Sequence, residues 1–131
     1  MRIAPDLLGA IVEHARRDAP NECCGMVATR AGEAVSVHAA TNTAASPFRF
    51  EVDGLELHRA LTGIEAAGNE LGAIYHSHTR SEPYPSQTDI NFAANWPGVE
   101  WIIVGLAGDD VEVKTWRIDD GDVTEAELVV E

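Results

Sequence analysis

The chain has 131 residues, of which 45% are hydrophobic and 24% charged, a composition typical of a single globular domain over residues 1–131. Its 22 acidic and 9 basic side chains give a net charge of −13, so we expect neither nucleic acid nor an anionic membrane as a partner. Charges at Asp6 and Glu13 interrupt the first apolar stretch, so neither a signal peptide nor a membrane span is predicted.

The first half of the chain alternates helix and strand signals. An amphipathic pattern with arginines at its C-terminal end predicts a helix over residues 5–17. Two apolar runs around a glycine turn predict a hairpin of strands 24–29 and 34–40, followed by a polar loop over 42–47. A second helix is predicted over 53–68, with an aspartate as its N-cap.

The second half contains most of the strand signals. An apolar strand is predicted over 71–75, and a polar-to-apolar run predicts a helix over 86–96. Three further strands are predicted over 99–106, 111–118 and 123–130. Helices interleaved with mostly hairpin-joined strands favour an α/β fold, with a mixed, curled sheet flanked by helices.

The pattern that carries chemistry begins at the end of the 71–75 strand. His76 and His78 are two residues apart, so on an extended backbone both imidazoles face the same side. Asp89 follows in the first turn of the next predicted helix. Two imidazole nitrogens and one carboxylate suit Zn²⁺, and three protein ligands leave a fourth tetrahedral position open, as in catalytic zinc sites. The pattern therefore indicates a zinc hydrolase.

Each half of this pattern also has a structural interpretation. Ser86 and Asp89 have the spacing of a helix capping box, which needs no metal. A His-x-His pair at a strand end is also found as a hydrogen-bonded surface feature. Pro83 and Pro85 lie in the loop between the two halves, and this loop can fold the helix start back over the strand end. The two halves together are a much more specific sign of a metal site than either half alone.

The spacing of His76, His78, Ser86 and Asp89 resembles the signature of the JAMM (MPN+) metallopeptidases. The segment 21–25, Asn-Glu-Cys-Cys-Gly, fits the family's glutamate before a Cys-Gly pair. The resemblance implies a JAMM/MPN sandwich like that of cytidine deaminases. It also implies one Zn²⁺ per chain, held by the two histidines and the aspartate.

The same resemblance implies roles for two further residues. Glu22 is expected to be the general acid and base, and Ser86 a donor to the oxyanion of the tetrahedral intermediate. The alternative for Glu22 is a solvated loop residue. Most members of the family have a proline after the second histidine, whereas this chain has Thr79, a departure that bears on loop shape and substrate choice.

The compact chain is most similar to the bacterial Mec group, which releases cysteine from the C-terminus of a ubiquitin-like sulfur-carrier protein. That leaving group has a free carboxylate, so we expect a cation nearby. Arg80, in the loop between the ligands, is the first candidate and Arg49 the second. The alternative for Arg80 is a solvent-exposed, solubilising residue.

Other interpretations remain open from the sequence. The chain is alternatively a deubiquitinase-like isopeptidase with another substrate, a non-catalytic MPN binding module, or a thiol enzyme that uses Cys23 or Cys24. These adjacent cysteines lack C-x-x-C spacing and suit a reducing cytoplasm. The remaining histidines, His14, His38 and His58, are expected to be surface or packed residues. Neither composition nor motif decides between a monomer and a homodimer.

Overall fold

The computed structural model describes all residues 1–131, which form three helices and eight strands in one sheet. The helices are α1 (Pro5–Asp18), α2 (Gly54–Ala66) and α3 (Gln87–Ala93). The strands are β1 (Arg2–Ile3), β2 (Cys24–Arg30), β3 (Glu33–Ala40), β4 (Glu70–His78), β5 (Glu100–Gly105), β6 (Glu112–Asp119), β7 (Asp122–Ala126) and β8 (Val129–Val130).

The sheet is mixed and curled, as predicted. Its strand order is β7-β6-β5-β4-β2-β3-β1-β8, with β4 antiparallel to β2 and parallel to β5. Helix α3 lies in the crossover between the two parallel strands. Strands β7 and β8 occupy opposite edges, although only Glu127 and Leu128 separate them in the chain. The two edges must therefore approach each other.

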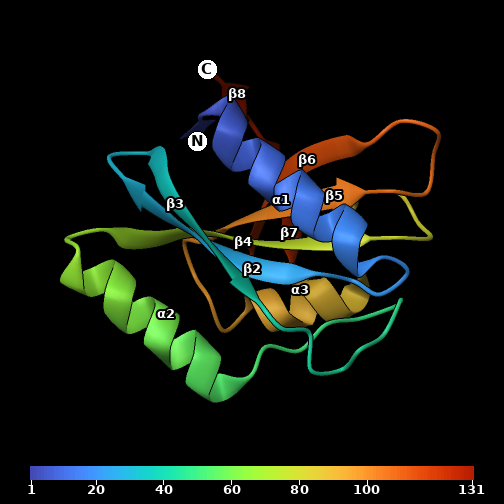
Figure 1. The fold of residues 1–131 in the computed structure, drawn as a ribbon, viewed down its shortest axis with the longest axis horizontal. Coiled ribbons are helices and arrows are strands. Elements are labelled where there is room, and N and C mark those ends of the chain that lie inside the picture. The colour runs from blue at the N-terminus through green and yellow to red at the C-terminus, as the bar shows by residue number, and fades with distance from the viewer.

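Helices cover both faces of this sheet, with α1 on one side and α2 and α3 on the other (Figure 1). Side chains of β4 alternate between two apolar clusters, because Ala73 and Tyr75 pack with α1 whereas Ile74 packs on the opposite face. The same alternation directs His76 and His78 toward the face that α3 covers. The histidine pair and the first turn of α3 thus meet on one side of the sheet.

The main differences from the predictions concern β1, the pair β7 and β8, and α3. The predicted strand over 123–130 is two strands, because β7 pairs with β6 whereas β8 pairs with β1 at the far edge. The two-residue strand β1 was not predicted, since its partners lie far away in the chain. Helix α3 ends at Ala93 instead of Trp96.

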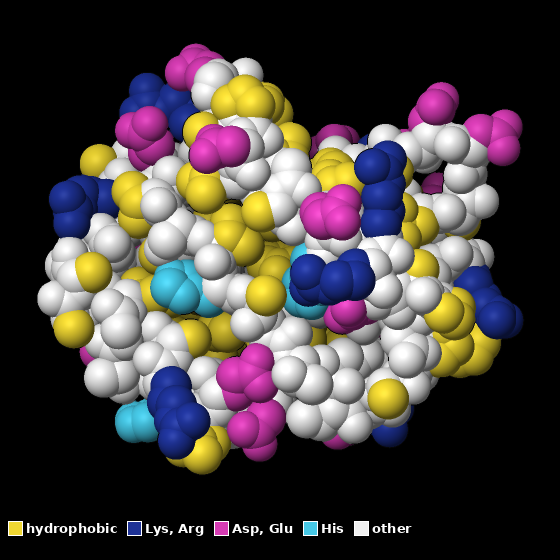
Figure 2. All heavy atoms as spheres, viewed as in Figure 1, with side chains coloured by type: hydrophobic (Ala, Val, Ile, Leu, Met, Phe, Trp, Pro, Cys, Tyr) yellow, Lys and Arg dark blue, Asp and Glu magenta, His cyan; other side chains and the backbone are white.

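The surface has no single basic stripe on the face that Figure 2 shows, where Lys and Arg side chains are scattered among acidic ones. None of the three helices has the length and apolar character needed to cross a bilayer.

Candidate metal centre and active site

The three predicted metal ligands converge at the C-terminal end of β4. His76 and His78 are the third-to-last and last residues of β4, and Asp89 is the third residue of α3. All three side chains are buried. Such a crevice outside the carboxyl end of a strand, next to the start of a crossover helix, is a common ligand site in α/β sheets.

The distances between the three ligand atoms fit a metal ion. Nε2 of His76 lies 3.1 Å from Nε2 of His78 and 3.1 Å from Oδ2 of Asp89. Nε2 of His78 lies 3.2 Å from the same carboxylate oxygen. Two ligand atoms bound to a tetrahedral Zn²⁺ at its usual bond lengths are about 3.3 Å apart. The three atoms therefore lie close to one face of such a tetrahedron.

Hydrogen bonding alone does not satisfy these atoms. Nδ1 of His78 donates to the carbonyl oxygen of Glu82 at 2.9 Å, so Nε2 of the neutral ring carries a lone pair. Oδ2 of Asp89 already accepts a bond from the backbone N–H of Ser86 at 2.9 Å. A single proton on Nε2 of His76 cannot satisfy three mutual contacts, whereas a cation between the three atoms does. The donor set thus fits a metal ion.

Asp89 is positioned by the start of α3. The hydroxyl of Ser86 accepts from the backbone N–H of Asp89 at 3.1 Å, and this bond and the reciprocal one form the capping box that the spacing predicted. Burial alone raises the pKa of Asp89, but the two imidazoles and the Ser86 N–H lower it well below its usual range. Asp89 is consequently a carboxylate at neutral pH.

The two imidazoles have different surroundings. Burial lowers the pKa of His76, against the opposing influence of Asp89. Burial acts in the same direction on His78, but its hydrogen bonds to Asp89 and to the Glu82 carbonyl raise its pKa overall. His76 stacks on Phe50 with 4.7 Å between ring centroids, which holds the orientation of the ring.

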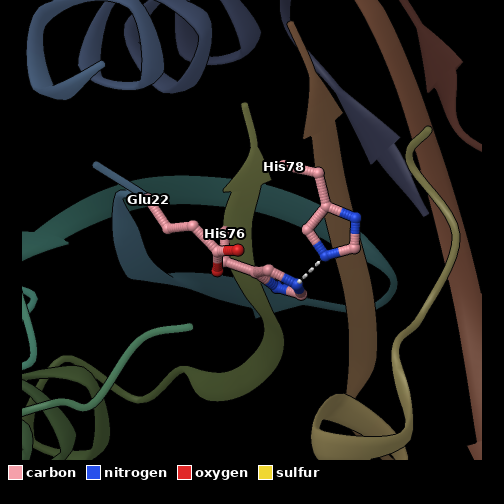
Figure 3. A group of neighbouring side chains, drawn as sticks. All are labelled: Glu22, His76 and His78. Atoms are coloured by element: carbon pink, nitrogen blue, oxygen red, sulfur yellow. Dashed lines mark hydrogen bonds between the residues drawn. The ribbon is translucent and has the colours of Figure 1, made fainter. Parts of the chain in front are cut away.

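Glu22 reaches the same centre from the loop before β2. Its carboxylate points toward His76 and His78 (Figure 3), and one oxygen lies within 4.8 Å of a ring nitrogen of each histidine. Oε1 of Glu22 is buried without a hydrogen-bond partner. Asp89 contacts both imidazoles at ligand-to-ligand distances, which suit a third ligand, and Glu22 lies beside these three residues.

The pKa of Glu22 suits a group that transfers protons at neutral pH. Burial raises its pKa to about 7, with His78 opposing the rise and Asp89 adding to it. A general base works best when its pKa lies near the working pH. The backbone of Glu22 is held on both sides, because its N–H donates to the Ser46 carbonyl at 2.9 Å and its carbonyl accepts from Asn42 at 3.0 Å.

Several residues that hold Glu22 in place were not identified from the sequence. The hydroxyl of Ser77 accepts from the backbone N–H of Cys23 at 2.8 Å, which ties β4 to the residue after Glu22. Gly25 leaves room for the ring of Tyr75, because a Cβ there would lie 2.3 Å from that ring. The glycine of the Cys-Gly pair is the only local sequence signal for this packing.

The predicted substrate-contacting residues lie in the loops around the site. The hydroxyl of Thr79 donates to the backbone carbonyl of Pro20 at 2.9 Å and lies 3.4 Å from the carbonyl of Pro47. The guanidinium of Arg80 lies 5.3 Å from the ring centroid of Phe48. Arg49 is exposed and pairs with Glu51. Thr79 thus ties three segments together, and the two arginines lie outside the ligand cluster.

Both cysteines are buried and free, at the head of β2. Burial raises the pKa of Cys23 and of Cys24 to about 12, so neither forms a useful thiolate at neutral pH. These environments disfavour the thiol-enzyme interpretation.

Comparisons with known proteins agree with this geometry. The family described as prokaryotic homologs of the JAB domain matches residues 4–119. The CysO-cysteine peptidase of Mycobacterium tuberculosis is 38% identical over 126 residues, covering 94% of this chain and 86% of that protein. The desampylase of Haloferax volcanii is 37% identical over 115 residues, covering 82% of each chain. A solution structure from Desulfitobacterium hafniense superposes with a TM-score of 0.88 at 26% identity, covering 100% of this chain and 93% of the other.

The family match extends over most of the chain, and the two relatives exceed 30% identity over more than four-fifths of it. The protein therefore belongs to the prokaryotic JAB family of JAMM/MPN metallopeptidases, which are hydrolases that act on peptide bonds.

Proposed function

We propose that the protein is a zinc-dependent peptidase that hydrolyses the amide at the C-terminus of a ubiquitin-like sulfur-carrier protein. The expected product is cysteine, released in cysteine biosynthesis or sulfur transfer. The observation that carries the proposal is the convergence of His76, His78 and Asp89 within 3.2 Å of one another, with the buried Glu22 beside them. The named function of the mycobacterial relative, a CysO-cysteine peptidase, supports this substrate class.

The two imidazoles and the Asp89 carboxylate would hold one Zn²⁺ per chain. When bound, this ion supplies Lewis-acid activation of water and of the scissile carbonyl. Glu22 takes a proton from the attacking water and gives it to the leaving amine, a contribution of roughly 10²–10⁴-fold. The Ser86 hydroxyl accepts from the Asp89 N–H, so its own hydrogen is free to donate to the oxyanion.

Loop residues near this centre are proposed to contact the carrier. Arg80 and Thr79 follow the second histidine ligand directly, and Arg49 lines a cavity that also includes Asp89. Residues 1–131 are proposed to act as one domain in the cytoplasm, where the free Cys23 and Cys24 remain reduced.

A second candidate function is cleavage of isopeptide bonds between a ubiquitin-like protein and a lysine of its target. The specific observation in its favour is the similarity to the desampylase of Haloferax volcanii. The two functions differ in the leaving group, which is a free amino acid in one case and a protein lysine in the other. A non-catalytic MPN module would cleave neither.

The experiment compares two conjugates of one carrier protein that ends in Gly-Gly, one with cysteine at the C-terminus and one with a lysine-linked target protein. Mass spectrometry of the products after incubation with the purified enzyme identifies the bond that is cleaved. We expect release of cysteine, loss of activity with a chelator, recovery with Zn²⁺ and no inhibition by an alkylating reagent. Inhibition by the alkylating reagent alone would contradict the metallopeptidase mechanism.

A further inference from the structure

A cavity of about 430 Å³ opens on the side of Glu22 that faces the end of α1. Its wall combines the end of α1, the loop before β2, the end of β3 and the segment after β3. The lining residues include His14, Arg17, Asp18, Asn21, Glu22 and Thr41. The volume lies within the range of small-molecule sites and accommodates one amino acid.

Arg17 is the only lysine or arginine in the lining of this cavity. Apart from Glu22, the acidic side chains in the same wall already have partners. Asp18 contacts Nε2 of the buried His14 at 3.1 Å, and Glu56 accepts from the Thr41 N–H at 2.7 Å. The closest approach of Arg17 to Asp18 is 3.9 Å, beyond hydrogen-bonding distance, so the donors of its guanidinium remain free for a ligand.

We propose that this cavity receives the amino acid that the enzyme releases, and that Arg17 binds its α-carboxylate. This inference rests on the proposed function, in which the scissile amide joins the carrier to an amino acid. A group that protonates the leaving amine has to come within hydrogen-bonding reach of it. Glu22 is that group in the proposed function and is also part of the cavity wall, so we infer that the leaving residue extends into this space. A guanidinium binds a carboxylate through two parallel hydrogen bonds.

Neither of the arginines predicted from the sequence has this placement. Arg80 lies over the ring of Phe48, and Arg49 pairs with Glu51. The cavity that Arg49 lines contains Asp89 and does not include Glu22. Only Arg17 belongs to the same cavity as the residue that protonates the leaving amine.

The test uses two conjugates of the same carrier protein, one ending in cysteine with a free carboxylate and the other in cysteine amide. For each enzyme variant, the ratio of kcat/KM between the two conjugates measures recognition of the carboxylate. We expect the wild-type enzyme to prefer the free carboxylate by about 10- to 100-fold, the range of a hydrogen bond to a charged group. Arg17→Gln should bring this ratio to about one, mainly through KM, and Arg17→Lys should give an intermediate ratio.

Arg16→Gln is the matched control, because it removes the same charge from the same exposed helix end outside the cavity. This variant should retain both the wild-type activity and the ratio. A wild-type ratio in Arg17→Gln, or a ratio of one in Arg80→Gln alone, would overturn the inference. Equal cleavage of both conjugates by the wild-type enzyme would overturn it while leaving the proposed hydrolysis intact. Cleavage of neither conjugate would refute the proposed function and, with it, this inference.

Discussion

Nδ1 of His14 and the hydroxyl of Tyr75 lie 2.7 Å apart, in a buried hydrogen bond that joins α1 to the strand with both imidazole ligands. The other nitrogen of His14 contacts Asp18 at 3.1 Å, so the histidine is held from both sides. Tyr75 in turn packs its ring against Gly25, three residues after Glu22. Helix α1 therefore stabilises the relative position of Glu22 and the two histidines at the end of β4.

A methyl group at Gly25 should disturb this arrangement. Its Cβ would lie 2.3 Å from the ring of Tyr75, so Gly25→Ala has to displace either this buried ring or one of the two strands. We expect a stability loss of about 1–3 kcal/mol from overpacking and a loss on the order of 10²-fold in kcat/KM from misplacement of Glu22. Urea unfolding and conjugate hydrolysis measure the two effects. Gly9→Ala is the control, because nothing lies within 4 Å of its added Cβ.

Glu22→Gln should separate metal binding from catalysis. The amide is similar in size to the carboxylate but cannot accept a proton from water, so we expect retention of zinc and a loss of roughly 10²–10⁴-fold in kcat. His78→Ala and Asp89→Ala should lose both the metal and the activity. Metal analysis of the purified variants and product detection by mass spectrometry give the two measurements. Hydrolysis at the wild-type rate by Glu22→Gln would show that another group is the base.

The raised pKa of Glu22 predicts a pH dependence of stability in the metal-free protein. Between its ordinary pKa of 4.5 and the folded value of about 7, the folded state holds a proton that the unfolded chain has lost. The free energy of unfolding therefore falls as pH rises through this window, by about 2 kcal/mol from this group. Urea titrations at pH 5 and pH 7.5 with a chelator should show this fall in the wild type. In Glu22→Gln the contribution of Glu22 to this pH dependence is absent, whereas the contributions of the histidines remain. If the free energy of unfolding changed equally with pH in both proteins, the pKa of Glu22 would not be raised.

Substitutions at Ser86 should distinguish its capping role from its proposed catalytic role. Ser86→Ala removes both, so we expect a stability loss of about 1 kcal/mol and a loss of about 10²–10³-fold in kcat. Ser86→Asp keeps a good N-cap but has no proton to donate, so stability should be retained and activity lost. Ser86→Thr keeps the hydroxyl and should retain both. Full activity in Ser86→Asp would exclude the hydroxyl as an oxyanion donor.

The convergence of His76, His78 and Asp89 could be predicted from the sequence because it depends on local geometry. The alternation of His76 and His78 on one strand and the position of Asp89 in the first turn of a helix both follow from short-range geometry. The family resemblance then identified Glu22, whose contact with the histidines joins segments more than fifty residues apart. No periodicity in the chain shows that contact.

Other features depend on long-range pairing and were not predictable. Strand β1 is only two residues long, and β8 pairs with it from the other end of the chain. For this reason the strand predicted over 123–130 did not reveal the break at Glu127 and Leu128. The burial of His14 likewise depends on Tyr75, which lies 61 residues away.

The loop between the last histidine ligand and Asp89 is anchored to the sheet independently of any ion. The indole N–H of Trp116 donates to the carbonyl of Pro83 at 2.9 Å, and Gly105 allows the proline ring to approach, since a Cβ there would lie 2.8 Å from it. The proposed metal site is therefore held in place by the fold itself. Unlike a zinc finger, whose folding consumes part of the binding free energy, this protein is expected to lose and regain a cation without unfolding.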